Sequence, residues 1–377
     1  MKKFVAVILS VILFIGSTVA VGAESDELRF GSDGKFTILQ ITDPQDDQYP
    51  ADELLVFLRK AVETSNPDLI VITGDLVEDS RIGDIGIDGQ NFKEGVEVEG
   101  DYEKTLENVK VAVDAIFSIL EEYEIPYVMC QGNNDYACGI KNEDWLKIYA
   151  SYPHCITVDQ SDDEDEKIDM YIPVKSSTSE ETAYGIFALD NGRGFKDGQA
   201  EWFNELDTGD VPTVVFEHKP VEEVGNLYEE CHIWDDGATV DGTTVLRLNH
   251  DIATGKAITA KEPGQSSSQF ADWKDKNVQG AFFGHIHCDG YTGVWDGITL
   301  GVTYGCEFAK MGSYGMRTVT LDEKDGSLET DIYVWEDGEF SVQQDEEYET
   351  HSGFICAVLA GIKHVFKFLY RGIRTLF

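Results

Sequence analysis

The sequence predicts an α/β fold whose centre is a parallel sheet with helices packed against it. Apolar stretches typical of buried strands begin at Phe36, Leu69 and Tyr127. Residues 53–65 and 102–123 separate these stretches and are predicted to be helices, the first with its leucines on one face. Strands that alternate with helices along a chain favour a parallel sheet, because each helical crossover returns the next strand in the same direction.

The second half of the chain is richer in strand-like segments. Predicted strands lie at residues 184–189, 213–216, 281–283, 298–302, 317–321 and 331–335. Polar stretches at about residues 79–102, 161–167 and 221–268 interrupt the pattern. We expect the last two to be surface insertions, which commonly shape access to a site.

Composition limits the function. The chain has 377 residues, of which 71 are Asp or Glu and 29 are Lys or Arg, for a net charge of −42. This balance argues against binding of a nucleic-acid polymer, which needs clustered cations to neutralise phosphates, and favours a solvated acidic surface. The seven cysteines form no C-x-x-C pair, which argues against a cysteine zinc site. Their disulfide pairing stays open.

The chain begins with a segment typical of export signals. Lys2 and Lys3 precede an apolar run, and small residues at 21–23 offer a cleavage site. We therefore predict a signal peptide at residues 1–23; the alternative is an uncleaved N-terminal anchor. Both interpretations place the body of the protein outside the cytoplasm, either secreted or on the outer face of the cell membrane.

The end of the chain has the opposite charge. After an acidic linker predicted at residues 336–352, residues 353–377 contain no Asp or Glu. Four cations there share one helical face: Lys363, Lys367, Arg371 and Arg374. The uncharged run at residues 352–362 is shorter than the about 20 apolar residues that a bilayer span needs. We predict a basic amphipathic helix that contacts an anionic membrane surface; a helix docked on the acidic body is the alternative.

Five polar motifs follow the predicted strands. They are Thr42-Asp43-Pro44-Gln45, Gly74-Asp75, Gly132-Asn133-Asn134-Asp135, Glu217-His218-Lys219-Pro220 and Gly284-His285-Ile286-His287. Ligands bind at the carboxyl ends of strands in open α/β sheets, so these motifs are expected to meet. Each motif alone is compatible with a turn or a helix cap. Together their carboxylate, amide and imidazole groups predict a metal site, and His285 and His287, two residues apart in an extended segment, point the same way.

In this order the five motifs resemble those of the calcineurin-like metallophosphoesterase superfamily, which are D-x-H or D-x-G, G-D, G-N-H-D/E, a lone His and G-H-x-H. Residues 218–223 resemble the H-x-P-x-x-E segment of its purple-acid-phosphatase-like branch, and residues 301–317 resemble its Gly- and aromatic-rich segment. The resemblance covers residues 33–335. It implies one phosphoesterase domain folded as a four-layer αββα sandwich, in which two mixed sheets lie between outer helices.

The resemblance also implies a site for two divalent metal ions, with Mn, Fe, Zn, Mg or Ca as candidates. Its ligands would be Asp43 and His287 for the first metal, Asp75 as the bridge, and Asn133, His218 and His285 for the second. In the family such a pair holds a phosphate, and a metal-bridging hydroxide attacks phosphorus. Phosphomonoesters are the first expected substrates; phosphodiesters, including nucleotides and lipid head groups, come second.

The first metal shell departs from the family pattern. Gln45 stands where the D-x-H form has a histidine, and Glu78 stands where purple acid phosphatases have a tyrosine. Our hypothesis is that Gln45, Glu78 or both complete this shell, and that oxygen ligands there favour Mn²⁺, Mg²⁺ or Ca²⁺ over Zn²⁺. The alternative is that Glu78 is a solvated loop acid.

The catalytic histidine of G-N-H-D/E is also replaced. Asn134 occupies its place, and Asp135 follows at the position of the acid that orients it. Asparagine donates hydrogen bonds but cannot act as a general acid, a role worth typically about 10²–10⁴-fold in rate. His232 and His250 are candidate substitutes, with ordinary surface roles as the alternative. The rival to a slow or leaving-group-selective enzyme is therefore a catalytically silent metal- or ligand-binding protein with the same fold.

Overall fold

The computed structural model describes residues 27–344, apart from 79–81, 83–100, 162–166, 236, 242–243, 259–267 and 309–311. The predicted signal peptide, the end of the acidic linker and the basic helix predicted at 353–377 lie outside the described residues. No helix in the described part is both long and apolar enough to cross a bilayer.

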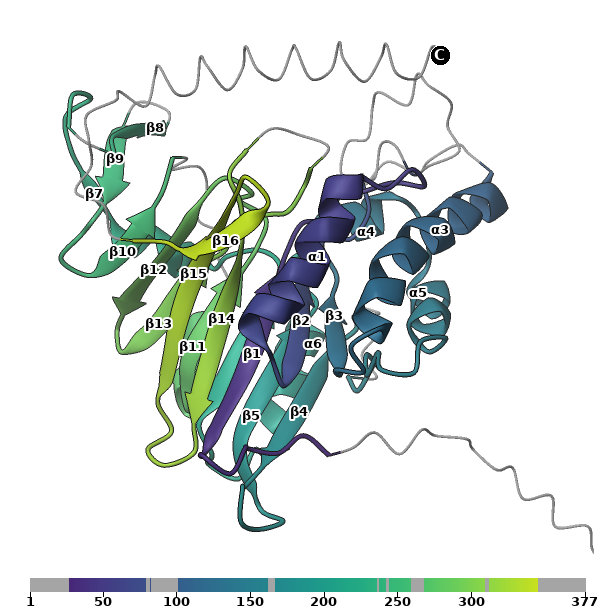
Figure 1. Ribbon diagram of the computed structural model, residues 1–377. Coiled ribbons are helices and arrows are strands. Elements are labelled where there is room, and N and C mark those ends of the chain that lie inside the picture. Colours follow the sequence, from purple (N-terminus) through teal and green to yellow (C-terminus); the bar gives the residue numbers. More distant parts are fainter. Residues whose placement is uncertain are drawn as a thin grey trace, which may run out of the picture.

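Two large sheets hold most of the strands (Figure 1). The first has six strands in the spatial order β16 (Glu339–Val342), β15 (Leu328–Glu336), β14 (Tyr314–Asp322), β1 (Lys35–Ile41), β2 (Leu69–Thr73) and β3 (Tyr127–Cys130). β1, β2 and β3 are parallel, as the sequence predicts, whereas β14 pairs antiparallel with β1. The carboxyl ends of the three parallel strands therefore lie at the same end of this sheet.

The second sheet has seven strands, in the spatial order β10 (Ala253–Lys256), β12 (Gly290–Trp295), β13 (Ile298–Val302), β11 (Val278–Phe283), β6 (Thr213–Glu217), β5 (Thr182–Leu189) and β4 (Met170–Lys175). β13, β11, β6 and β5 are parallel, and β4 and β12 pair antiparallel with β5 and β13. The predicted set lacks β4, β10 and β12. Each contains Pro or Gly, which are poor strand formers.

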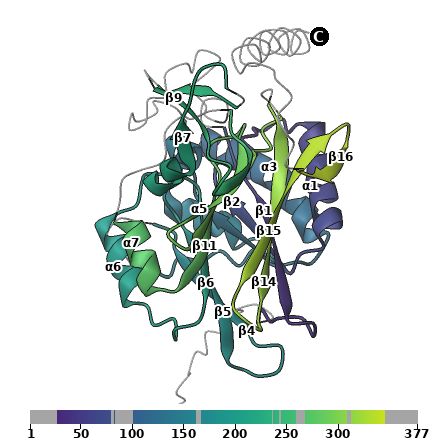
Figure 2. The same ribbon diagram turned by 90° about the vertical axis from the view of Figure 1, so that its left-hand side faces the viewer.

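Helices cover the outer faces of both sheets. α1 (Asp52–Ser65), α3 (Tyr102–Glu121) and α5 (Asn142–Tyr149) pack on the six-stranded sheet, whereas α6 (Asp197–Glu205) and α7 (Gln269–Asp275) pack on the seven-stranded sheet. Figure 2 shows α6 and α7 on one side of the two sheets, with α1 and α3 on the other. Three hydrophobic clusters fill the spaces between these layers. The predicted four-layer αββα sandwich is confirmed.

Strand side chains alternate between two of these clusters. Ile38 of β1 and Val71 of β2 face the other sheet, whereas Leu39 and Ile72 face the helices. Successive side chains of a strand point to opposite faces, so a strand buried on both sides has a continuous apolar sequence. The run LIVIT in β2, buried at all five positions, is such a strand.

The predicted insertion at residues 221–268 has structure of its own. It contains the 3₁₀ helix η1 (Glu222–Leu227) and a small sheet of β7 (Tyr228–Glu230), β9 (Thr244–Leu248) and β8 (Thr239–Asp241), and its β10 joins the seven-stranded sheet. Val224, Leu227 and Leu248 are buried in the cluster between that sheet and α7. The insertion is therefore packed on the body of the protein through an apolar base.

The six-stranded sheet extends into the segment predicted as an acidic linker. Phe340 of β16 packs against Phe57 of α1 and Trp335 of β15, with ring centroids 4.9 and 4.8 Å apart. The side chain of Phe340 thus anchors β16, whose other residues are mostly polar. The sheet reaches residue 342, beyond the predicted domain boundary at residue 335.

Arg317 of β14 joins the two sheets. Its side chain is fully buried, and its guanidinium donates five hydrogen bonds of 2.6–2.9 Å. The acceptors are the hydroxyls of Thr292, Thr303 and Thr330 and the carbonyls of Tyr291 and Val302. Thr330 belongs to β15, whereas Thr292 and Val302 belong to β12 and β13, so one side chain couples both sheets.

We expect Arg317→Met to lower the free energy of unfolding by about 3 kcal/mol or more, because buried acceptors lose their donor. The matched substitution Lys324→Met, in the exposed turn between β14 and β15, should change it by less than about 0.5 kcal/mol. Urea denaturation followed by circular dichroism measures both. A loss below about 1 kcal/mol for Arg317→Met would contradict its bridging role.

Candidate metal centre

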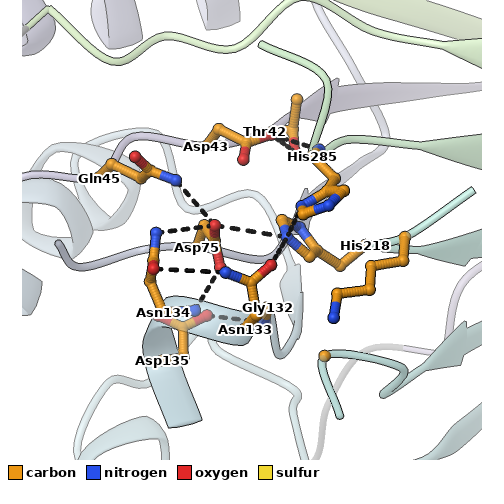
Figure 3. A network of polar contacts seen from close by, with 12 residues as sticks. Thr42, Asp43, Gln45, Asp75, Gly132, Asn133, Asn134, Asp135, His218 and His285 are labelled. Atoms are coloured by element: carbon orange, nitrogen blue, oxygen red, sulfur yellow. Dashed lines mark hydrogen bonds and ion pairs between the residues drawn. The ribbon is translucent and has the colours of Figure 1, made fainter. Parts of the chain in front are cut away.

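The carboxyl ends of parallel strands bring the polar motifs together. In the six-stranded sheet, β1 and β2 lead into Asp43 and Asp75. In the seven-stranded sheet, β6 leads into His218 and β11 leads into His285 and His287. Figure 3 shows the side chains of Asp75, His218 and His285 directed toward one another across the boundary between the sheets.

The acidic and imidazole groups form two sets of candidate ligands. One set comprises Asp75, His218 and His285, and the other comprises Asp43, Asp75 and His287. Within each set the ligand atoms lie within 4.8 Å of one another. Asp75 is common to both sets, as a carboxylate that bridges two cations must be. His285 and His287 are only half-buried, so the site reaches the surface.

Left-handed backbone conformations shape these loops. φ is positive at four site residues, Asp43 (51°), Gln45 (39°), Asp75 (52°) and His285 (69°). Non-glycine residues rarely adopt such angles, and each stores about 1–3 kcal/mol of strain that surrounding contacts must offset. Backbone hydrogen bonds from Asp43 to the carbonyl of Gly74 (3.1 Å) and from Gln45 to that of Asp75 (2.9 Å) tie the first two loops together.

Two glycines allow the loops to approach one another. A Cβ at Gly132 would collide with the carboxylate of Asp75, and a Cβ at Gly284 would collide with the hydroxyl of Thr42. Gly132 and Gly284 are therefore required, because a side chain at either position would overlap the loop of Asp75 or the loop of Asp43.

Asn133 and the two imidazoles around Asp75 form a connected group. The Nδ1 atom of His218 lies 2.8 Å from the carbonyl oxygen of Thr73, so this nitrogen donates and Nε2 faces the site. His218 Nε2 lies 3.4 Å from Oδ2 of Asp75 and 3.2 Å from Oδ1 of Asn133. The Nδ1 atom of His285 is 3.2 Å from the same His218 nitrogen. The amide oxygen of Asn133 thus lies where the resemblance implies a ligand to the second metal.

Gln45 links the group around Asp43 to Asp75. Its Nε2 donates to Oδ2 of Asp75 at 2.7 Å and lies 3.1 Å from Nε2 of His287. Oδ2 of Asp43 accepts the hydroxyl of Thr42 (2.7 Å) and the backbone N–H of His285 (2.8 Å). Oδ1 of Asp43 is buried and lies 3.1 Å from Nε2 of His287, which donates to it when the ring is protonated.

The carboxylates and imidazoles of the site change the pKa values of one another. Burial disfavours a charged imidazole, yet Asp75 raises the pKa of His218 to about 9, and Asp43 raises the pKa of His287 well above its usual value. Burial and the neighbouring His218 lower the pKa of His285 to about 4. Burial opposes ionisation of Asp43 and Asp75, but the imidazoles hold the pKa of each below its ordinary value.

Asn134 and Asp135 open the short helix α4 (Asn133–Ala137) and act on the loop of Asp75. The backbone N–H and the Nδ2 of Asn134 donate to the two carboxylate oxygens of Asp75, at 2.8 and 2.9 Å. The carboxylate of Asp135 accepts the backbone N–H groups of Leu76, Val77 and Gly132, at 2.9–3.2 Å. Asp135 therefore holds the backbone of the site together. In these three bonds its carboxylate contacts backbone groups and not the side chain of Asn134.

Other predicted residues are not brought to the ligand sets. Glu78 is buried and its backbone N–H bonds to Asp46, but its carboxylate belongs to neither set. Gln45 contacts both Asp75 and His287, and the hypothesis that Gln45, Glu78 or both complete the first shell stays a prediction. His232 and His250 are both exposed and also lie outside the two sets.

Sequence reasoning missed Glu307. This residue is 3% exposed, and its Oε2 lies 3.0 Å from Nδ1 of His287. The only signal in the sequence was its position inside the Gly- and aromatic-rich segment at residues 301–317. Nothing in the spacing of the five motifs indicates that this acid returns to the site.

The donor set fits a pair of divalent cations. The carboxylates of Asp43 and Asp75 are enclosed, and Oδ1 of Asp43 lies 3.1 Å from Nε2 of His287, an arrangement that a metal could join once the ring loses its proton. Imidazole nitrogens face these carboxylates from the other sheet. A half-turn of the Gln45 amide exchanges its nitrogen and oxygen, which makes it an oxygen donor at the same place.

We expect Mn²⁺ binding at pH 7 to release protons. In the metal-free chain the pKa values of His218 and His287 are raised, so both rings hold a proton that a metal must displace. Affinity should therefore increase with pH until at least about 9, where His218 loses its proton unaided. Isothermal titration calorimetry in two buffers of different ionisation enthalpy counts the protons. Equal binding enthalpies in both buffers would contradict this assignment.

Several solved structures resemble the chain at low sequence identity. A dimetal phosphatase from Danio rerio is 13% identical, with 82% of this chain and 99% of that chain covered and a TM-score of 0.48. GAP50, the anchor in the inner membrane complex of Plasmodium, is 12% identical, with 88% and 94% covered and a TM-score of 0.45. A 5′-nucleotidase from Candida albicans is 11% identical, with 90% and 58% covered and a TM-score of 0.35. Likeness at this level supports no inference about function.

The family of the chain follows from its sequence. No curated protein matches the chain at a significant level. Residues 36–289, however, match the family described as calcineurin-like phosphoesterase, and this range includes all five polar motifs. The closer resemblance to the purple-acid-phosphatase-like branch stays a prediction. The chain belongs to the calcineurin-like phosphoesterase family.

Proposed function

We propose that this protein hydrolyses phosphomonoesters in a metal-dependent reaction at the site formed by the two ligand sets. The observation that carries the proposal is the position of Asp75, whose carboxylate belongs to both sets. A carboxylate shared in this way holds two cations side by side, and such a pair clamps a phosphoryl group. Membership of the family supports phosphoester chemistry in general; the monoester and its small-molecule or lipid-head-group character are our proposal.

Each cation would have its own ligands in addition to Asp75. Imidazole and amide ligands are neutral, so the pair keeps a positive charge that attracts phosphate in an otherwise acidic protein. When bound, two divalent cations supply a hydroxide near neutral pH and stabilise charge on the phosphoryl oxygens. The proposed ligands are Asp43, Gln45 and His287 for the first metal and Asn133, His218 and His285 for the second.

Asn134 determines which esters this chain can cleave quickly. Its amide Nδ2 donates to Asp75 at 2.9 Å, at the half-buried start of α4. An amide in this place can donate a hydrogen bond to a substrate oxygen, but it cannot protonate a leaving group. We therefore propose a preference for esters with good leaving groups, such as aryl phosphates.

The second candidate function is metal binding without catalysis. Asn134 favours this function, because it stands where the family has the histidine that donates a proton. A silent protein would bind Mn²⁺ at Asp75 and hydrolyse no phosphoester, so binding and turnover measured together separate the two functions.

We expect hydrolysis of p-nitrophenyl phosphate in the presence of Mn²⁺, abolished by EDTA and reduced at least about 10³-fold by Asp75→Asn. Loss of both cations removes several kcal/mol of charge stabilisation, and each about 1.4 kcal/mol is tenfold in rate. Asp275→Asn is the matched control, because this exposed acid precedes β11 and lies at the end of the sheet opposite the site. Turnover that survives both EDTA and Asp75→Asn would refute a metal-dependent reaction.

We expect Asn134→His to raise the rate on alkyl phosphates by about 10²–10⁴-fold, because a proton donor is restored beside the leaving group. The rate on p-nitrophenyl phosphate should change much less, because its leaving group needs no proton. Steady-state kinetics on the two substrates give the comparison. An equal change for both would show that position 134 does not serve the leaving group.

A further inference from the structure

Glu307 is a buried acid that reaches the site from outside the five motifs. It lies beyond residues 36–289, the part of the chain that matches the family. Its side chain is 3% exposed, and Oε2 lies 3.0 Å from Nδ1 of His287. Burial of a carboxylate is unfavourable unless hydrogen bonds compensate, and the imidazole of His287 supplies one such partner to Glu307.

Backbone hydrogen bonds fix the loop that presents Glu307. The N–H of Gly305 donates to the carbonyl of His287 at 2.9 Å, and the N–H of Cys306 donates to the carbonyl of Thr42 at 3.0 Å. The loop is thus tied on one side to the residue that Glu307 contacts and on the other to the residue before Asp43. Glu307 is therefore placed by the same loops that form the first metal site.

The contact orients the ring of His287. A carboxylate at Nδ1 accepts the proton of that nitrogen, which leaves the lone pair of Nε2 for a cation. His287 Nε2 lies 3.1 Å from Oδ1 of Asp43 and 3.1 Å from the amide of Gln45, on the side of the predicted first metal. His218, in the other set, is oriented differently, because its Nδ1 faces the neutral carbonyl of Thr73.

The first metal site has only one imidazole, His287, whereas the second has two, His218 and His285. The first site contains the amide of Gln45 where the D-x-H form of the family has an imidazole, and an amide is the poorer donor. A carboxylate behind a histidine increases the basicity of that ligand. The single imidazole of this site is therefore the one that has a carboxylate partner.

We propose that Glu307 is a positioning residue that fixes the tautomer of His287 and strengthens it as a ligand, and that it thereby compensates for Gln45 at the first metal. The inference rests on the proposed two-metal site. It concerns metal affinity, and it holds whether or not the enzyme is fast.

The test is the affinity of each site for Mn²⁺, measured by isothermal titration calorimetry on the metal-free full chain. Gln45→Ala identifies the first site as the one that it weakens. Glu307→Ala should weaken that site about 10- to 100-fold and leave the second unchanged, with a smaller loss for Glu307→Gln, which keeps an acceptor. Gln45→His, added to Glu307→Ala, should restore the lost affinity.

Glu323→Gln is the matched control. Its carboxylate accepts the N–H and hydroxyl of Ser177 at 3.0 and 2.5 Å, beside the start of β1 and hence at the opposite end of the sheet from Asp43. It should alter neither affinity. The melting temperature of the metal-free chain should be similar for Glu307→Gln and the wild type.

Three results would overturn the inference. They are unchanged first-site affinity in Glu307→Ala, an equal loss at both sites, and a loss that Gln45→His does not restore. A wild-type chain that binds no Mn²⁺ would instead refute the proposed two-metal site, so the two failures are distinguishable.

Discussion

The structure depends on one carboxylate that both sheets can reach. Asp75 leaves β2 in a left-handed conformation, and its oxygens accept hydrogen bonds from Gln45 and Asn134 while lying 3.4 Å from His218. β2 and β6 belong to different sheets, so this contact requires that both sheets present the carboxyl ends of parallel strands on the same side. Arg317 and the core between the sheets maintain that relation, and the fold acts as a rigid frame for a bridging group.

Charge explains why such a frame would favour cations. Asp43 and Asp75 are enclosed, and their charge raises the pKa of both His218 and His287, so that in the metal-free chain protons on these rings provide the compensating charge. A divalent pair supplies positive charge without those protons. Such a pair would also reverse the local potential in a chain whose net charge of −42 would otherwise repel a phosphate.

Much of this architecture could be predicted, because strands buried on both faces produce unbroken apolar runs such as that of β2, and the polar motifs follow those runs directly. β4 and β16 could not, since β4 contains Pro173 and β16 is a mostly exposed strand that is anchored through Phe340. Glu307 contacts His287 across 20 residues of chain, a relation that no local pattern encodes. Glu78 was predicted from its position three residues after Asp75; it belongs to neither of the two ligand sets, and its role as a ligand stays a prediction.

The most direct test of the central claim is anomalous diffraction from crystals of the full chain grown with Mn²⁺. The account predicts two anomalous peaks that both contact the carboxylate of Asp75, one on the side of Asp43 and His287 and the other on the side of His218 and His285. Absence of peaks at Asp75, or manganese bound only elsewhere on the acidic surface, would contradict it.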